Sequence, residues 1–309
     1  MIIKIKKIIL IVITVFILIG LLGYFSYKIL VIYEKSNKER IVLEKRKIAW
    51  INLKGVLASR INRFPGVCAV VVEDLSTGWS YAHNDDKLFA SASLVKLPIM
   101  LAVFQAELKG MLDLDGTIKL KRSHITGGSG VLKGMPLGSF VSGDKLIEYM
   151  INNSDNTASN IFIDSLGFNY LNNTFKNFGL KNTNLSRKMM DFTYRKRGVE
   201  NYTTAGDMSL LLRKLYKQEI LSPSLSKKAL NLLSNQKIND RIPVKLPYGT
   251  LVAHKTGLER YVCHDIGIVY TKKGDYLITV LTKSKKGFNK SKILIANLAL
   301  DVYNYYNNF

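Results

Sequence analysis

A serine and a lysine three positions apart, Ser93 and Lys96, carry residue types that can perform acyl transfer. They stand at the head of a mostly apolar stretch, residues 94–108, which we predict to be helical. Residues three apart lie on one face of a helix, so the lysine amine projects beside the serine hydroxyl. A serine hydroxyl becomes a good nucleophile when a neighbouring base removes its proton, and a lysine is such a base if burial or nearby positive charge lowers its pKa. Alone, this spacing is more often found on a solvated helix surface.

Two further motifs favour the chemical interpretation of this pair. Ser154-Asp155-Asn156 lies in a polar break between two predicted helices, and Lys255-Thr256-Gly257 lies at the end of a predicted strand. Ser-x-x-Lys, Ser-Asp-Asn and Lys-Thr-Gly in this order are typical of class A β-lactamases and penicillin-binding proteins. The chain therefore resembles a class A β-lactamase-type serine hydrolase over residues 51–309, and the resemblance extends along residues 128–132 and 154–160.

The resemblance implies the catalytic roles. Ser93 is the acyl-accepting nucleophile, Lys96 is its activating neighbour, and Ser154 relays a proton to the leaving nitrogen. The backbone N–H groups of Ser93 and Leu258 form the oxyanion hole. The alternative interpretation of Ser154 is that its side chain only caps a helix.

The same resemblance implies the substrate-binding residues. Asn156 hydrogen-bonds the amide side chain of the substrate. Lys255 and Thr256, followed by Gly257, offer a positive charge and a hydroxyl to the substrate carboxylate. Asp155 is expected to hold its lobe together through its carboxylate, and ordinary strand packing is the alternative for Thr256.

One position departs from the family pattern. The family has a glutamate on a loop after the second motif, where it positions the water that hydrolyses the acyl-enzyme. Alignment of residues 185–192 puts Met189 at that position, and a thioether cannot act as a general base. Asp191, two residues further along, could be the general base only if the loop differs in conformation from that of the family. The favoured interpretation of its carboxylate is an ion pair with Arg187. We expect acylation with Lys96 as base, followed by slow deacylation or deacylation by another route.

The composition limits the classes of binding partner that we expect. The 309-residue chain is 47% hydrophobic and has a formal net charge of +22. No basic helix interleaved with aromatic residues and no zinc-finger spacing is visible, so we expect no nucleic acid, while a preference for polyanionic surfaces stays open. Cys68 and Cys263 are predicted to be buried free thiols, with a single bridge left open. The four histidines have no metal-site spacing, and we expect no metal and no cofactor.

The N-terminus predicts membrane attachment. Residues 8–27 lack charged side chains and are long enough to span a bilayer as a helix. No alanine precedes Ala49, so we predict an uncleaved anchor over residues 1–33, with a cleaved signal as the alternative. Residues 34–50 are predicted to form a charged helical stalk. Basic residues on both flanks leave the orientation open.

The order of the remaining segments predicts an α/β (α+β) fold. Strands come early and late in the chain, and a helical stretch separates them. We expect an antiparallel sheet flanked by N- and C-terminal helices, with an inserted all-helical lobe over residues of about 88–245, as in β-lactamases and transpeptidases. The active site would lie where the sheet and this lobe meet.

These patterns favour a serine acyl-transfer hydrolase that acts on β-lactams. The first alternative is a D-Ala-D-Ala carboxypeptidase or penicillin-binding protein of cell-wall metabolism, and the second is a non-hydrolytic sensor of β-lactams or wall peptide. Such substrates lie outside the cytoplasmic membrane, so we expect a single-pass protein of the cell membrane whose catalytic domain is extracellular. The expected partners are a β-lactam or peptidoglycan peptide and the membrane, and we expect a monomer.

Overall fold

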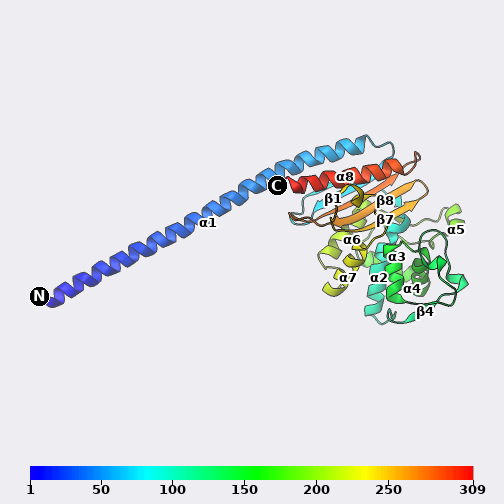
Figure 1. The fold of residues 1–309 in the computed structure, drawn as a ribbon, viewed down its shortest axis with the longest axis horizontal. Helices are drawn as coiled ribbons and strands as arrows, with labels where there is room; N and C mark the ends of the chain where they lie inside the picture. The colour runs from blue at the N-terminus through cyan, green and yellow to red at the C-terminus, as the bar shows by residue number, and fades with distance from the viewer. Residues whose placement is uncertain (309) are drawn as a thin grey trace. The chain divides into compact units, whose positions relative to one another are not determined.

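The computed structural model describes residues 1–308, which form two compact units that divide between Leu53 and Lys54. The first unit is the greater part of helix α1 (Ile2–Asn62), shown in Figure 1. This helix contains a segment near the N-terminus that is apolar and long enough to cross a membrane, as a signal sequence also would be. The charged residues 34–50 are helical, as their pattern predicts.

The second unit is built on a five-stranded antiparallel sheet with the strand order β2-β1-β9-β8-β7. Its strands are β1 (Val67–Asp74), β2 (Ser80–His83), β7 (Val252–Glu259), β8 (Val262–Val269) and β9 (Tyr276–Lys283). Strand β1 pairs along its whole length with β9, so the two ends of the domain meet in one sheet, as predicted. Every residue of β8 is buried, which requires cover on both faces of the sheet.

Helices supply that cover. Helix α8 (Asn289–Asn307) lies on one face and α6 (Ala205–Tyr216) on the other (Figure 1). The final turns of α1 join α8 through a bidentate ion pair between Arg60 and Asp301. The buried Tyr276 hydroxyl donates to the Ala299 carbonyl at 3.0 Å, so β9 and α8 are also held by a hydrogen bond.

The inserted lobe is mainly helical, but four short strands interrupt it. The helices besides α6 are α2 (Lys96–Leu108), α3 (Gly143–Asn152), α4 (Asn156–Asn177), α5 (Phe192–Lys196) and α7 (Pro223–Ser234). The strands form two small ladders, β3 (Phe89–Ala90) with β6 (Tyr202–Thr203) and β4 (Thr117–Lys119) with β5 (Phe140–Ser142). The expectation of an all-helical lobe missed these strands because two- and three-residue ladders have no periodicity to read.

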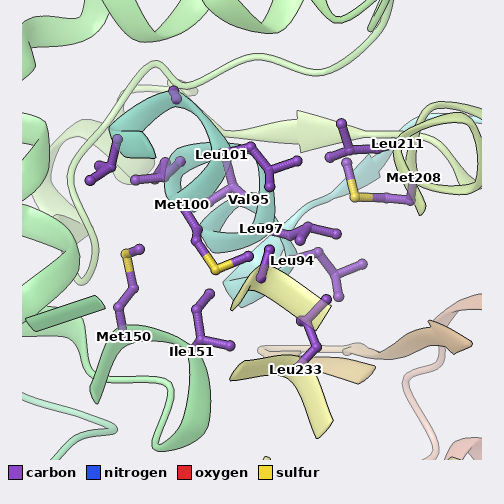
Figure 2. Packing of buried hydrophobic residues seen from close by; sticks show 14 of the residues in the cluster. Leu94, Val95, Leu97, Met100, Leu101, Met150, Ile151, Met208, Leu211 and Leu233 are labelled. Atoms are coloured by element: carbon purple, nitrogen blue, oxygen red, sulfur yellow. The ribbon is translucent and has the colours of Figure 1, made fainter. Parts of the chain in front are cut away.

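Helix α2 is the centre of the lobe. All its residues from Lys96 to Phe104 are buried. Figure 2 shows Leu97, Met100 and Leu101 surrounded by side chains of α3, α6 and α7, among them Ile151, Met208 and Leu233. A helix that is apolar on all sides must be enclosed, and its enclosure fixes the start of α2 in space.

The two cysteines are buried free thiols. Cys68 and Cys263 both lie opposite Thr282, one on each side of β9. Neighbouring strands are about 4.8 Å apart, so the two Cα atoms are separated by roughly 10 Å. A disulfide needs Cα atoms closer than about 7 Å, which excludes the bridge that the sequence left open.

Candidate active site

Ser93 lies in a 3-10 turn (Ala92–Val95) that leads directly into α2. Ala92, just before it, has a φ of 47°, a left-handed conformation that costs an L-residue roughly 1–2 kcal/mol. Neighbouring hydrogen bonds hold this turn, since the Ser91 N–H donates to the Asn201 carbonyl at 2.8 Å and its carbonyl accepts from Leu94 at 3.0 Å. The result is that Ser93 is half-buried and lines a cleft, while the next turn enters the core.

Lys96 is fully buried beneath this turn. Its Nζ donates to the Ser154 carbonyl at 2.5 Å, to Asn156 Oδ1 at 2.7 Å and to Ser154 Oγ at 3.3 Å. Burial lowers the pKa of Lys96 well below its usual value, the charge of Lys255 lowers it further, and Asp155 opposes the shift. A lowered pKa increases the unprotonated fraction of the amine near neutral pH, which a general base requires.

Ser154 is the point at which the two lysines converge. Lys255 Nζ donates to Ser154 Oγ at 3.1 Å, and Lys96 Nζ donates to the same oxygen at 3.3 Å. Ser154 itself has a φ of 53°, between the end of α3 and the start of α4. A hydroxyl has one proton to donate and two lone pairs that accept, so Ser154 can exchange protons with a group in the cleft while both amines contact its oxygen.

Asp155 stabilises the lobe, as expected. Its carboxylate caps α4 by accepting from the Ala158 N–H at 3.0 Å, and its second oxygen accepts from Val131 at 2.7 Å and Leu132 at 2.8 Å. A Cβ on Gly130 would lie 2.3 Å from this carboxylate, and Gly130 has a φ of 125°. Only glycine therefore fits where this loop passes over Asp155.

Asn156 lines the cleft and is already hydrogen-bonded at both ends of its amide. Its Nδ2 donates to the Gly127 carbonyl at 2.9 Å, and its Oδ1 accepts from Lys96. Each amide atom can form one further hydrogen bond, because the nitrogen has a second N–H and the oxygen a second lone pair. The side chain is thus held in place with capacity left for a ligand.

The Lys255-Thr256-Gly257 motif lies inside β7, which continues to Glu259, and not at the end of a strand as the sequence suggested. Lys255 and Thr256 are buried, and Lys255 Nζ also donates to the Thr256 carbonyl at 3.1 Å. Burial is the main cause that lowers the pKa of Lys255 to about 7, with Asp265 opposing and Arg241 adding to the shift. The amine is therefore near the midpoint of its titration at neutral pH.

Strand β7 is an edge strand, so one row of its backbone N–H groups is not used within the sheet. Leu258 lies on this edge and lines the cleft together with Ser93. A Cβ on Gly257 would lie 3.2 Å from Leu94 Cγ and 3.3 Å from the Ser91 carbonyl. Glycine thus permits the close approach of β7 to the turn that carries Ser93.

Two buried histidines, His254 and His264, form hydrogen bonds next to the motifs. His254 Nδ1 lies 2.9 Å from Asp265 Oδ1, and its Nε2 lies 2.9 Å from Asn239 Oδ1. His264 Nε2 lies 2.9 Å from the Ala90 carbonyl, and burial lowers the pKa of this imidazole to about 4. The pairing of Asp265 with His254 on the neighbouring strand had no signal in the sequence. Within residues 1–308 no three His, Cys, Asp or Glu side chains form a metal-binding group.

Met189 is buried and lines the cleft. The Asn160 amide holds its backbone on both sides, accepting from the Met189 N–H at 2.8 Å and donating to its carbonyl at 3.1 Å. The predicted ion pair between Asp191 and Arg187 is wrong. Asp191 caps α5 by accepting from the Tyr194 N–H at 3.1 Å, because the chain turns away after Met190, which has a φ of 64°.

Arg187 instead joins a group of four charges that the sequence analysis missed. Its Nη2 lies 2.7 Å from Glu200 Oε1 and 2.9 Å from Glu259 Oε1, and Arg195 Nη1 lies 2.7 Å from Glu259 Oε1. We call Arg187, Arg195, Glu200 and Glu259 the charge quartet. The quartet joins the 187–200 loop to the end of β7. Charged residues are frequent throughout the chain, so no local signal distinguishes these four.

The cleft has a volume of about 710 Å³ and extends from Ser93 and Asn156 to the charge quartet and α5. Of the predicted site residues, Ser93, Asn156 and Leu258 line this cleft. The structure brings Lys96, Ser154 and Lys255 together directly behind it through the hydrogen bonds described above. The three motifs thus form one site, with a nucleophile at the surface and two amines of lowered pKa beneath it.

Known proteins are similar to this chain in sequence and in fold. β-Lactamase VEB-1 of Pseudomonas aeruginosa is 25% identical over 246 residues, which cover 73% of this chain and 80% of that protein. The crystal structure of a β-lactamase from Sphaerobacter thermophilus has a TM-score of 0.76 at 27% identity and covers 84% of this chain and 98% of its own. A Leu-to-Glu mutant of PBP-A, solved as its acyl-enzyme complex with penicillin G, has a TM-score of 0.77 at 29% identity, over 84% of this chain and 97% of its own.

A family model described as the β-lactamase enzyme family matches residues 52–306. This range contains all three motifs, the sheet and the inserted lobe. The chain therefore belongs to the β-lactamase family of serine hydrolases.

Proposed function

We propose that this protein is a membrane-anchored serine hydrolase that β-lactams acylate at Ser93 and that releases the acyl group slowly. Ser93 Oγ attacks the β-lactam carbonyl, and Lys96 accepts the hydroxyl proton. The C–N bond of the ring then breaks as Ser154 donates its proton to the nitrogen and recovers one from the lysines. The convergence of Lys96 and Lys255 on Ser154 Oγ carries this proposal, because it connects the base to the proton donor.

Substrate binding follows from the two sides of the site. The N–H groups of Ser93 and Leu258 stabilise the oxyanion of the tetrahedral intermediate. Asn156 binds the amide of the substrate side chain with its remaining hydrogen-bonding capacity. Lys255 and Thr256 bind the carboxylate next to the scissile amide, a feature that β-lactams share with D-alanyl-D-alanine.

Slow deacylation follows from Met189. Hydrolysis of the ester requires a group that removes a proton from water, and the thioether at this cleft position is not basic. The two carboxylates that also line the cleft, Glu200 and Glu259, are engaged by the arginines of the charge quartet. An acyl-enzyme that persists would bring the protein close in behaviour to a penicillin-binding protein.

The decisive experiment is a time course of intact-protein mass on the full-length chain in detergent with benzylpenicillin, while the remaining drug is quantified. We expect an adduct of one penicillin that persists for many minutes and is absent from Ser93→Ala, with far-ultraviolet circular dichroism unchanged in that variant. Rapid turnover without an adduct would contradict slow release, and an adduct on Ser93→Ala would contradict the nucleophile.

A D-Ala-D-Ala carboxypeptidase of cell-wall metabolism is the second candidate function. The similarity to PBP-A favours it. Release of D-alanine from an acylated D-alanyl-D-alanine peptide, lost on benzylpenicillin treatment, would establish this activity. A protein that binds penicillin but releases no D-alanine would instead match the sensor alternative.

The membrane anchor belongs to the same proposal. The apolar part of α1 supports a single transmembrane helix, and the substrates of the site support an extracellular catalytic domain. Protease added to intact cells should then degrade the domain. A domain that is protected until the cells are lysed would contradict this orientation.

A further inference from the structure

The residues that line the cleft include an apolar group and a charged group. Met190, Phe192 and Leu258 form the apolar group, and each of them is substantially exposed. The charged group has four cationic side chains and two acidic ones, namely Arg187, Arg195, Lys196, Arg260, Glu200 and Glu259. An acyl chain attached to Ser93 would lie in the same cleft as these apolar and charged residues.

The charge quartet is internally neutral. Glu259 accepts from Arg187 at 2.9 Å and from Arg195 at 2.7 Å, and Glu200 lies 2.7 Å from Arg187 and 3.6 Å from Arg195. Two arginines and two glutamates thus satisfy one another. The positive excess of the cleft therefore resides in Lys196 and Arg260.

Lys196 and Arg260 are both exposed and belong to different elements. Lys196 is the last residue of α5, and Arg260 follows the last residue of β7. Arg260 donates to the Tyr261 hydroxyl at 3.0 Å, which leaves most of its five N–H donors available. Two cations that line one cleft from two elements produce a local positive potential that attracts an anion.

We propose that Lys196 and Arg260 bind a carboxylate at the end of the acyl-donor side chain, so that the preferred substrates carry a second negative charge beside the one that Lys255 recognises. This inference rests on acylation at Ser93 and names the substrate class for that reaction. The carboxylate can come from a β-lactam side chain or from the acidic side chain of a wall peptide.

The test compares two penicillins whose side chains differ only at the tip, 6-hexanoylamino- and 6-adipoylaminopenicillanate. The second-order rate constant of Ser93 acylation is measured by intact mass on the full-length protein in detergent at low salt. We expect the adipoyl compound to react about 3- to 10-fold faster, as for an exposed charge pair in a steering field. The preference should diminish near 1 M salt, where the screening length is about 3 Å.

Substitutions test whether Lys196 and Arg260 cause the preference for the adipoyl compound. The double variant Lys196→Gln, Arg260→Gln should bring the ratio of the two rates to within about 2-fold. Arg197→Gln is the matched control, because Arg197 is an exposed cation that stacks 5.8 Å from the Tyr194 ring and does not line the cleft. This control should keep the wild-type ratio.

Two results would overturn the inference while acylation itself stands, namely equal rates for the two compounds in the wild type or a preference that survives in the double variant. Failure of both compounds to acylate Ser93 would instead remove the proposed function and the inference with it. N-hexanoyl- and N-adipoyl-D-alanyl-D-alanine distinguish the two sources. The same preference in D-alanine release supports a wall-peptide carboxylate, and a preference confined to penicillins supports a β-lactam side chain.

Discussion

Replacement of Met189 with glutamate should convert a long-lived acyl-enzyme into one that turns over. Asn160 fixes the Met189 backbone through two hydrogen bonds, so the new side chain starts from the same position and points into the same cleft. A positioned general base is worth about 10²–10⁴ in rate, and we expect the lower end because the contacts around this position hold a thioether and not a carboxylate. A 100-fold shorter lifetime corresponds to about 2.7 kcal/mol of barrier.

The cost to folding should be tolerable. Met189 is 7% exposed, and exchange of its apolar tip for a polar group should cost about 1–3 kcal/mol, a part of the 5–15 kcal/mol typical of a domain. Burial also raises the pKa of the introduced carboxyl, so deacylation should accelerate as the pH rises through that pKa.

The assay for this substitution is the decay of the benzylpenicillin adduct after removal of free drug, followed by intact mass. Met189→Gln is the control, since it has nearly the same shape without a base, and its adduct should decay within a few-fold of the wild type. A folded Met189→Glu protein with an unchanged adduct lifetime would refute the reasoning. Equal acceleration by glutamine would also refute it, because the effect would then come from water entry and not from a base.

Three further predictions follow from the same geometry. Lys96→Ala should reduce the benzylpenicillin acylation rate by about 10²–10⁴, the usual contribution of a positioned general base, and stopped-flow or mass kinetics will measure this rate. An unchanged rate would exclude Lys96 as the base. Since the pKa of Lys255 is about 7, the protonated form that binds a carboxylate becomes less populated as the pH rises through 7. The saturation constant for benzylpenicillin should therefore increase between pH 6 and pH 8. A constant value over this pH range would contradict the assigned role of Lys255. Gly130→Ala should destabilise the domain by more than about 2 kcal/mol, because its Cβ would meet the Asp155 carboxylate at 2.3 Å, and a melting temperature equal to the wild type would disprove the steric argument.

Local signals explain what the sequence analysis predicted correctly. Periodicity or a continuous run of one residue type predicts three features of the chain. These are the apolar N-terminal stretch, the helix that starts after Ser93 and the late strands. The sequence analysis did not predict the short strands of the lobe or the position of the third motif inside β7. The pairing partner of a strand, and not its local pattern, determines where the strand ends.

The sequence by itself determined the chemical inventory of this protein: a serine and a lysine one helical turn apart, two further motifs, and a thioether where the family has a carboxylate. Only the tertiary structure decided how these groups interact. Ser154 meets Lys96 across 58 positions and Lys255 across 101, and enclosure of both amines in the core is what lowers their pKa values. The structure likewise paired Arg187 with Glu200 and Glu259 in place of the nearer Asp191. Desolvation and long-range pairing depend on which surfaces meet after folding, and no local spacing specifies that.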